Sequence, residues 1–433
     1  MKHVSIKQLI HILGILTLCC FLVLSCSKKD DTPPEPTPPV SITVSPTSVV
    51  LPSSGGTQTV TVTTTASDWS VSSGASWLRV SKLNSTSASV EAPANMNVSR
   101  SAVATFTAGT ATATVNVSQS QLSAIQIDSL ALVDLYNATG GANWKNKWTL
   151  TSPLSQWYGV EVIDGQITKL DLPDNNLVGA LPENIGELAQ LQYCDLRDNQ
   201  LSGAIPASLN TCTQIFYLDL SGNMFDSTPS FNALNKLVML DLSFNDLTTL
   251  PVLNNNLPQL EYLAFKKNRL SGTLPSNWSA YIKLRYMDLS ENEFSSEIPA
   301  GWSSFKQMEI LHLYLNRLSG VIPAYLATFS PLKSLALNHN NLTGSIPESL
   351  CNLPALNELL LAQNRLTGDI PIALLEHPYW NAWKSGICPQ QSGYGFSNCS
   401  SGAQGIQGTA SKTKTLSAGE SYKARYRRLT IDD

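Results

Sequence analysis

The chain has 433 residues, 42% of them hydrophobic, which is enough for more than one packed core and excludes wholesale disorder. Its 28 Lys and Arg against 32 Asp and Glu give a net charge of -4, so we expect no nucleic-acid partner, because such partners call for a strongly basic face. The sequence contains five His and none of the common hydrolase, zinc-protease or phosphate-loop motifs. We therefore predict a protein that is not an enzyme and has neither cofactor nor metal.

The N-terminus has the features of a secretory signal. Two lysines precede an apolar run over residues 9–24, which is shorter than the roughly 20 residues needed to span a bilayer. The run leads into Val23-Leu24-Ser25-Cys26, which resembles a bacterial lipobox and marks Cys26 as the lipidated cysteine. We expect residues 1–25 to be a lipoprotein signal peptide; the alternative is an uncleaved membrane helix.

Residues 26–40 are predicted to be a tether. A short charged run, residues 28–31, precedes a proline-rich stretch, a composition typical of an extended, semi-rigid linker. The charged run resembles the export tag of Bacteroidetes surface lipoproteins. That resemblance implies a lipid-anchored protein of the outer membrane, exposed at the cell surface.

Residues 41–121 are predicted to form a small β-sandwich. The segments 60–63 and 112–117 alternate apolar and polar residues, as half-buried strands do, and residues 52–56 are a turn cluster. The segment resembles a BACON domain in its sequences Ser67-Asp68-Trp69-Ser70-Val71, Ala75-Ser76-Trp77-Leu78-Arg79-Val80, Asn97-Val98-Ser99-Arg100 and Val115-Asn116-Val117-Ser118-Gln119. That family implies carbohydrate binding, for which Trp69 and Trp77 are candidates; the alternative is that both belong to the core.

Residues 167–376 contain nine repeats. Asn recurs every 22 to 24 residues in the frame L-x-x-L-x-L-x-x-N-x-L, and most units continue into G-x-I-P. One repeat cannot bury its apolar side alone, so the units must stack into a solenoid with a parallel sheet on the concave face and an irregular or short helical convex side. We expect the Asn side chains to satisfy backbone groups at the turns.

The 24-residue unit resembles the plant-receptor class of leucine-rich repeat. In that class a segment such as 122–166, with Trp144 and the sequence Trp157-Tyr158-Gly159-Val160, forms an N-terminal cap. Units three and four lack G-x-I-P, which puts their second, lateral strand in doubt. Residues 377–399 are predicted to be the C-terminal cap, and residues 400–433 a basic, disordered tail of unknown role.

The five cysteines that follow Cys26 are predicted to be structural. Cys194, Cys212 and Cys351 occupy positions of the repeats where a small apolar residue fits. Cys388 and Cys399 lie in the C-terminal cap, where they either form a disulfide in an oxidising compartment or remain free.

The outward positions of the concave strands define the candidate binding site. Aspartates of successive strands form a like-charge column, which requires water, protons or cations, and tyrosines run beside it. The predicted ligand-binding residues are Tyr193, Tyr217, Tyr262, Tyr286, Asp195, Asp219, Asp241 and Asp288. We expect these side chains to be exposed and to bind a protein or peptide partner, with a glycan as the alternative ligand. Asp288 and His312 are neighbours in the column, but the sequence shows no nucleophile or third group beside them.

Overall fold

The computed structural model describes residues 39–254, 257–399 and Lys423. The predicted signal peptide, Cys26 and most of the tether lie outside the described residues, as does the predicted tail except for Lys423. Within the described part of the chain, no helix combines the length and apolar character that crossing a bilayer requires. Two compact units are present, a strand-rich unit and a repeat array, and each is treated by itself.

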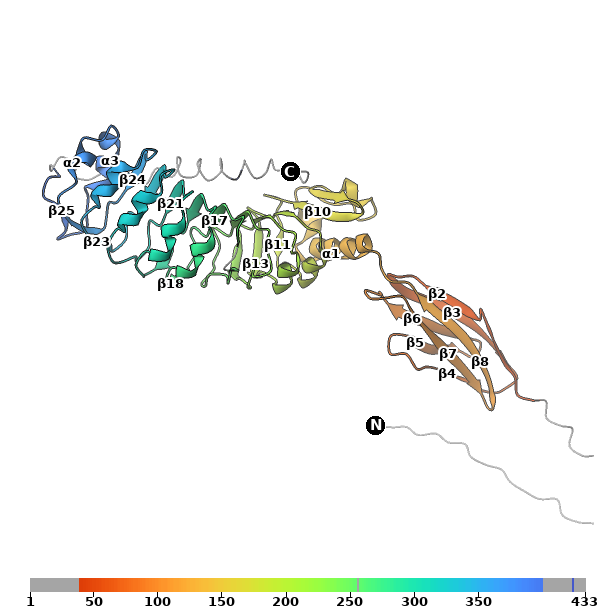
Figure 1. Ribbon diagram of the computed structural model, residues 1–433. Helices are drawn as coiled ribbons and strands as arrows, with labels where there is room; N and C mark the ends of the chain where they lie inside the picture. The colour runs from red at the N-terminus through yellow and green to blue at the C-terminus, as the bar shows by residue number, and fades with distance from the viewer. Residues whose placement is uncertain (1–38, 255–256, 400–422, 424–433) are drawn as a thin grey trace, which may run out of the picture. The chain divides into compact units, whose positions relative to one another are not determined.

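The strand-rich unit consists of two four-stranded sheets (Figure 1). One sheet has the order β1-β3-β6-β5 and the bounds Ile42–Ser45, Gly55–Thr64, Ser87–Pro93 and Arg79–Asn84. The other has the order β2-β8-β7-β4 and the bounds Ser48–Leu51, Ala111–Gln119, Arg100–Ala108 and Ser70–Ser73. All neighbours are antiparallel except β2 and β8, which are parallel.

The alternating segments predict the buried faces of this unit correctly. In β3, Val60 and Val62 are buried while Thr61 between them is exposed. Trp69 belongs to the same core, and its indole N–H donates a hydrogen bond of 2.7 Å to the carbonyl of Ser85. Trp77 is only partly buried and packs at the edge of this core. The two-sheet fold is therefore the predicted one, while membership of the BACON family stays a prediction.

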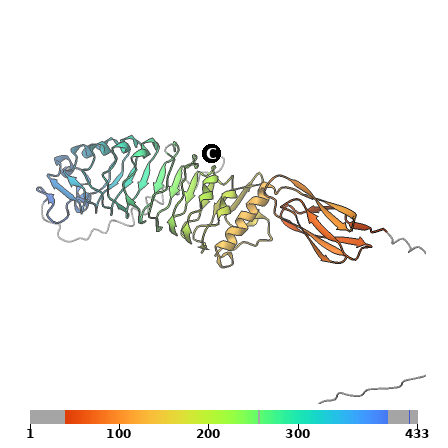
Figure 2. The ribbon, with the colours of Figure 1, turned by 90° about the horizontal axis from the view of Figure 1, so that it is seen from below.

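The repeat array is built on a ten-stranded sheet that is parallel except at β9 (Figures 1 and 2). Its first two strands are β9, Val160–Ile163, and β10, Gln166–Asp171. The strands β12, β14, β16, β17, β19, β21, β22 and β24 follow one per repeat, with the bounds Tyr193–Asp195, Tyr217–Asp219, Met239–Asp241, Tyr262–Ala264, Tyr286–Asp288, Ile310–His312, Ser334–Ala336 and Glu358–Leu360. A leucine-rich-repeat solenoid, the predicted fold class, is thus confirmed.

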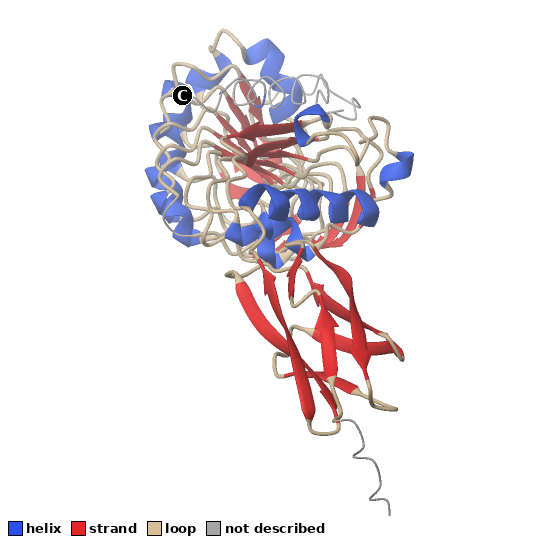
Figure 3. Ribbon diagram, turned by 90° about the vertical axis from the view of Figure 1, so that its right-hand side faces the viewer, coloured by secondary structure: helices blue, strands red, loops and turns tan. Residues whose placement is uncertain are grey.

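The other sides of the coil carry short lateral strands and 3-10 helices (Figure 3). The lateral strands are β11, β13, β15, β18, β20, β23, β25 and β26, with the bounds Val178–Gly179, Gln200–Ala204, Met224–Ser227, Ser271–Gly272, Glu293–Phe294, Thr343–Gly344, Arg365–Gly368 and Gly395–Phe396. The helices η3 to η8 each follow a proline and have the bounds Glu183–Glu187, Ala207–Thr211, Ser276–Ala280, Ala300–Ser304, Ala324–Thr328 and Glu348–Asn352.

Units three and four differ from the others in these connections. Unit three keeps a lateral strand, β15, which pairs with β13, so the doubt raised by its missing G-x-I-P was wrong for that unit. In the described residues of unit four there is no lateral strand; an isolated bridge joins Phe231 to Leu253, and the N–H of Asp246 donates to the carbonyl of Phe225 at 2.9 Å. No 3-10 helix occurs among the described residues from 228 to 270. In the other units such a helix follows the proline of G-x-I-P or a related sequence, and units three and four lack that motif.

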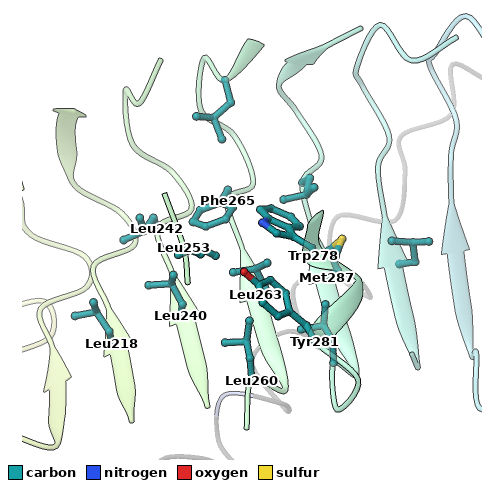
Figure 4. Close-up of a cluster of buried hydrophobic side chains, with 14 of the residues drawn as sticks. Leu218, Leu240, Leu242, Leu253, Leu260, Leu263, Phe265, Trp278, Tyr281 and Met287 are labelled. Atoms are coloured by element: carbon teal, nitrogen blue, oxygen red, sulfur yellow. The ribbon is translucent and has the colours of Figure 1, made fainter. Parts of the chain in front are cut away.

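The inward side chains of the coils form one continuous apolar core. Leu218, Leu240 and Leu263 stack along consecutive strands, and Phe265 and Trp278 lie beside them in the same apolar cluster (Figure 4). All five are at most 3% exposed. Each repeat therefore covers the apolar side of its neighbour, as the period predicts.

The recurring Asn residues tie consecutive coils together. The Asn223 amide donates to the carbonyls of Leu196 in the previous unit and Leu220 in its own, each at 3.0 Å. Its carbonyl oxygen accepts from the backbone N–H of Leu201 at 3.0 Å. The same pattern recurs from Asn199 to Asn364, which confirms that these residues satisfy buried backbone groups.

Both ends of the array are closed. At the start, helix α1 (Ala124–Ala138) places the Asp128 carboxylate so that it accepts the backbone N–H of Ile167 at 2.9 Å. Helices η1 (Gly141–Asn143) and η2 (Leu154–Gln156) complete this cap. At the far end, α2 (Ile372–Leu375) and α3 (Trp380–Ile387) follow the last repeat, and Trp383 is buried. A disulfide joins Cys388 to Cys399, with 6.1 Å between their Cα atoms.

Candidate functional site on the concave face

The strand register places the predicted site residues in two columns. Tyr193 pairs with Tyr217, and Tyr262 with Tyr286, in consecutive steps of the sheet interrupted by Met239. The aspartate column runs parallel to them through Asp195, Asp219, Asp241, Ala264, Asp288 and His312. The repeat frame predicted both columns, because residues two apart in a strand point to the same face.

The expectation that these side chains are exposed was wrong. The four tyrosines are 0 to 5% exposed and the four aspartates 0 to 2%. The tyrosine rings stack on each other in pairs, with ring centroids 4.2 Å apart for Tyr193 and Tyr217 and 4.3 Å apart for Tyr262 and Tyr286. The outer face of the sheet thus carries a second, smaller apolar cluster, which includes Met239. Strand spacing favours this stacking, since neighbouring strands bring equivalent rings to within contact distance.

Asp195, which lies between Asp171 and Asp219 in the strand register, has its cation within its own repeat. Arg197 forms an ion pair with one carboxylate oxygen, and the backbone N–H of Arg197 donates to the other at 3.2 Å. Burial and the negative charge of Asp219 raise the pKa of Asp195 to about 7, against the opposing effect of Arg197. Asp195 is therefore a buried carboxyl group that changes charge near neutral pH.

Asp219 and Asp241, in the middle of the column, share a cation from the distant C-terminal segment. The ammonium of Lys423 lies 3.0 Å from Oδ2 of Asp219 and 2.7 Å from Oδ2 of Asp241. It also donates to the hydroxyl of Ser221 at 3.3 Å. Lys423 is 6% exposed, so the three charged groups form a buried ionic cluster.

The remaining oxygens of this pair are held by the backbone. Oδ1 of Asp219 accepts the N–H of Ser221 at 3.1 Å and its hydroxyl at 2.5 Å, and Oδ1 of Asp241 accepts the N–H of Ser243 at 2.8 Å. The phenol of Tyr262 donates to Oδ2 of Asp241 at 3.1 Å. Both carboxylates are therefore fixed in orientation, with their Oδ2 atoms directed at one point.

The electrostatics of the cluster reflect burial opposed by Lys423. Burial raises the pKa of Asp219, but Lys423 and Ser221 outweigh it and leave the pKa below its usual value. The pKa of Asp241 stays raised, because burial and the charge of Asp219 exceed the effect of Lys423. Burial lowers the pKa of Lys423, but the two carboxylates outweigh it and the net shift is upward, so the ammonium stays charged.

Asp288 begins a polar chain that crosses four strands. Its Oδ2 lies 3.7 Å from Nδ1 of His312, and Nε2 of His312 lies 2.8 Å from the Ser334 hydroxyl. Ser334 donates to the Glu358 carboxylate at 2.6 Å, so His312 Nε2 is the donor toward Ser334. Sequence reasoning did not find Ser334 and Glu358 as members of this chain. The arrangement places Asp, His and Ser in order, yet the imidazole faces the serine with a proton and does not accept one.

The columns border a hollow of about 280 Å³ on the outer face of the sheet. Asp241, Tyr262, Phe244, Lys266 and Lys423 are among its lining residues. Lys266 contributes a second cation. Its ammonium lies 3.3 Å from the Glu291 carboxylate and donates to the hydroxyl of Tyr314. Nowhere in the described part of the chain do three His, Cys, Asp or Glu side chains gather in a way that could hold a metal ion.

The hollow and its cations were only partly visible in the sequence. Arg197 and Lys266 stand in the outward position that follows the aspartate column, so the repeat frame placed them beside it. Lys423 had no such signal beyond the basic composition of the C-terminal segment. Ser221 and Lys423 are 202 residues apart in the sequence. Lys423 lies outside the repeats, so the repeat pattern could not predict their contact.

With this geometry in place, comparison with known proteins bears on the repeat array. Residues 165–225, 283–305 and 306–366 match models of the leucine-rich repeat. The array is similar to the leucine-rich-repeat ectodomain of the plant membrane receptor kinase GASSHO1/SCHENGEN3 from Arabidopsis thaliana, solved in complex with CASPARIAN STRIP INTEGRITY FACTOR 2. The identity is 25% and the TM-score 0.54, over 60% of this chain and 35% of that one.

Two further solved structures extend the comparison. The ectodomain of the Arabidopsis receptor kinase HAESA, in complex with an IDA peptide hormone ligand, is 25% identical with a TM-score of 0.49, over 58% of this chain and 44% of that one. The Leptospira interrogans leucine-rich-repeat protein LIC12759 is 29% identical with a TM-score of 0.40, over 46% and 51% of the two chains. This chain spans about a third to a half of the length of these proteins. No protein of curated function matches it. The chain thus contains leucine-rich repeats, and a plant receptor ectodomain is among the solved structures similar to its repeat array.

Proposed function

We propose that this chain is a non-catalytic recognition protein of the cell surface, lipid-anchored through Cys26, which binds a protein or peptide partner on its concave face. The observation that carries the proposal is the hollow of about 280 Å³, bordered by buried charges and aromatic rings on the outer face of the parallel sheet. Aromatic residues are enriched at protein interfaces and among the residues that dominate binding energy, and Phe244, which lines the hollow, is 38% exposed.

The comparison with the receptor ectodomain supports the same partner class. That ectodomain was solved in complex with CASPARIAN STRIP INTEGRITY FACTOR 2 and shares the repeat architecture with this chain. A non-catalytic role is favoured by the polar chain from Asp288 to Glu358. Ser334 donates its proton to Glu358, so His312 does not activate it as a nucleophile.

A partner search with matched variants tests the binding face. The full chain is screened on an array of secreted and surface proteins beside a glycan array. Phe244, which lines the hollow and is 38% exposed, has φ 57°, so Phe244→Asn removes the ring while keeping a residue that tolerates this backbone. The control is Ile282→Asn, which removes an exposed apolar side chain elsewhere.

We expect a protein or peptide hit whose affinity falls by about tenfold or more in Phe244→Asn and is unchanged in Ile282→Asn. A hit that binds both variants as well as the wild type would place the site away from the concave face. Hits confined to the glycan array would favour the alternative, a glycan-binding surface protein that uses the strand-rich unit or the tyrosines.

The anchor is tested separately. In Cys26→Ser the thiol that carries the lipid is absent, so the protein should lose metabolic palmitate labelling and leave the membrane fraction. Cys351→Ser, which removes a free thiol of the repeat array, is the control. Labelling that persists in Cys26→Ser would contradict the lipobox assignment.

A further inference from the structure

We propose that Asp219, Asp241 and Ser221 form a subsite for the primary ammonium of a lysine side chain, and that Lys423 of the same chain occupies it until a partner lysine displaces it. The inference rests on the proposed function, since it names the chemistry that the concave face recognises. It follows from the contrast between this pair and the other aspartates of the column.

The pair has no cation of its own within the repeats. Asp195 is paired with Arg197, two residues along the same coil. Among the ion pairs of the described residues, Asp219 and Asp241 are paired with Lys423 alone. The repeats thus bury two carboxylates side by side without a local counter-charge, and such a site stabilises whichever cation enters it.

The geometry selects an ammonium. An ammonium has three protons, and three oxygens converge on Lys423 Nζ, two carboxylate Oδ2 atoms at 3.0 and 2.7 Å and the Ser221 hydroxyl at 3.3 Å. A planar guanidinium prefers two parallel bonds to one carboxylate. Here each Oδ1 atom is already held by backbone N–H groups, so neither carboxylate offers both of its oxygens.

The subsite opens onto the hollow in which we place the partner. Asp241, Ser221 and Lys423 all line that hollow, together with Phe244 and Tyr262. A lysine that enters from a bound peptide therefore meets the same oxygens that hold Lys423. Because a group tethered in the same chain competes at an effective concentration in the millimolar range, Lys423 weakens binding of an external lysine until other contacts compensate.

The first test asks whether Lys423 occupies the subsite in solution. Wild-type protein is treated with limiting acetic anhydride, and the acetylation rate of each lysine is measured by mass spectrometry. Lys147, which is exposed, is the internal reference. We expect Lys423 to react at least tenfold more slowly than Lys147, and more quickly in Asp219→Asn. Equal rates for Lys423 and Lys147 in the wild type would overturn the occupancy.

The second test asks which ligand the vacated subsite takes. The probe is Nα-acetyl-L-lysine N-methylamide, titrated by NMR against full-length wild type, Lys423→Ala and Lys306→Ala. Lys306 is an exposed lysine, so its variant matches the change in net charge. We expect the probe to bind Lys423→Ala at least tenfold more tightly than the other two proteins, and Asp219→Asn in the Lys423→Ala background to abolish that gain.

The corresponding norleucine and arginine amides define the chemical class. Neither should show the gain in Lys423→Ala. Equal binding of the norleucine amide would overturn the ammonium subsite, and equal binding of the arginine amide would overturn lysine as its ligand.

These outcomes are separable from the proposed function. A partner that needs Phe244 but binds Asp219→Asn normally would overturn the subsite and leave the function standing. If the lysine probe binds but no protein on the array does, the subsite stands and the proposed function is overturned.

Discussion

The two faces of the ten-stranded sheet are both buried, but for different reasons. Inward residues such as Leu218 and Leu240 are apolar and lie against the next coil. Outward residues such as Asp219 are as well buried, at 0% exposed, although the repeat pattern assigns them to the surface. On the inner face burial follows from apolar period alone. On the outer face, burial depends on a separate partner for each side chain. Each tyrosine has a stacked ring, and each aspartate has a cation or a hydrogen-bond donor.

This difference shows how polar burial is tolerated in a repeat protein. A like-charge column is unfavourable unless each charge is compensated. Along this column the partner changes from Arg197 at Asp195, to Lys423 at Asp219 and Asp241, to the backbone N–H of Ser290 at Asp288. The inner face accepts no such variation, because its neighbours have no polar group to offer.

The inner face should show the largest effect of a single substitution. Leu289→Asp places a carboxylate in the shared core, and we expect a loss of about 4 kcal/mol or more, because a buried charge there is unpaired. Urea unfolding measures the loss, and hydrogen exchange should show it spreading to the neighbouring coils. The control Leu289→Met conserves volume and should cost less than about 1.5 kcal/mol. Unchanged stability in Leu289→Asp would contradict the inner-face register.

The tyrosine stack should contribute to folding in spite of lying on the outer face. Tyr217 is 0% exposed, so Tyr217→Ala should lower the free energy of unfolding by about 3 kcal/mol, as for other buried aromatic residues. Tyr217→Phe keeps the stacked ring and should cost about 1 kcal/mol or less. Tyr158→Ala, at a residue that is 47% exposed, should stay within about 0.5 kcal/mol. A Tyr217→Ala variant as stable as Tyr158→Ala would mean that the rings are free to move into solvent.

The smallest effect is a pH dependence that belongs to the outer face alone. The folded-state pKa of Asp195 is about 7, above its ordinary value of 3.8. Between these values the folded state holds a proton that the unfolded state has released, so stability falls as the pH rises, by at most about 1.4 kcal/mol per pH unit. The contribution is full below the unfolded value and lost above about pH 7.

Asp195→Asn should remove that slope. We expect the free energy of unfolding of the variant, measured by urea at about pH 5 and about pH 8, to fall less between the two than that of the wild type. Asp226→Asn removes an exposed carboxylate and is the control. Parallel curves for the wild type and Asp195→Asn would show that Arg197 keeps Asp195 ionised throughout.

Much of the fold followed from the sequence because a repeat interacts with its neighbours in a constant way. The 22 to 24 residue spacing of the Asn residues predicted the coils, and the leucine frame predicted which residues pack inward. The same frame predicted that Tyr193 would neighbour Tyr217 and that Asp219 would neighbour Asp241. The short helices were expected only as a class, since their bounds depend on where each G-x-I-P proline falls.

What the tertiary structure decided is the state of those outward residues. The two-residue period of a strand predicts which face a side chain occupies. It does not predict whether a neighbouring ring or charge covers that side chain. The stacking of Tyr262 on Tyr286 depends on side-chain rotamers, and the proton on His312 Nε2 depends on the donor that Ser334 offers to Glu358. Lys423 reaches Asp219 across some two hundred residues, and no local propensity or repeat encodes that distance. The contact between Lys423 and Asp219 is stabilised by pairing two buried carboxylates with a cation. That pairing is possible only once the coils have brought the carboxylates together.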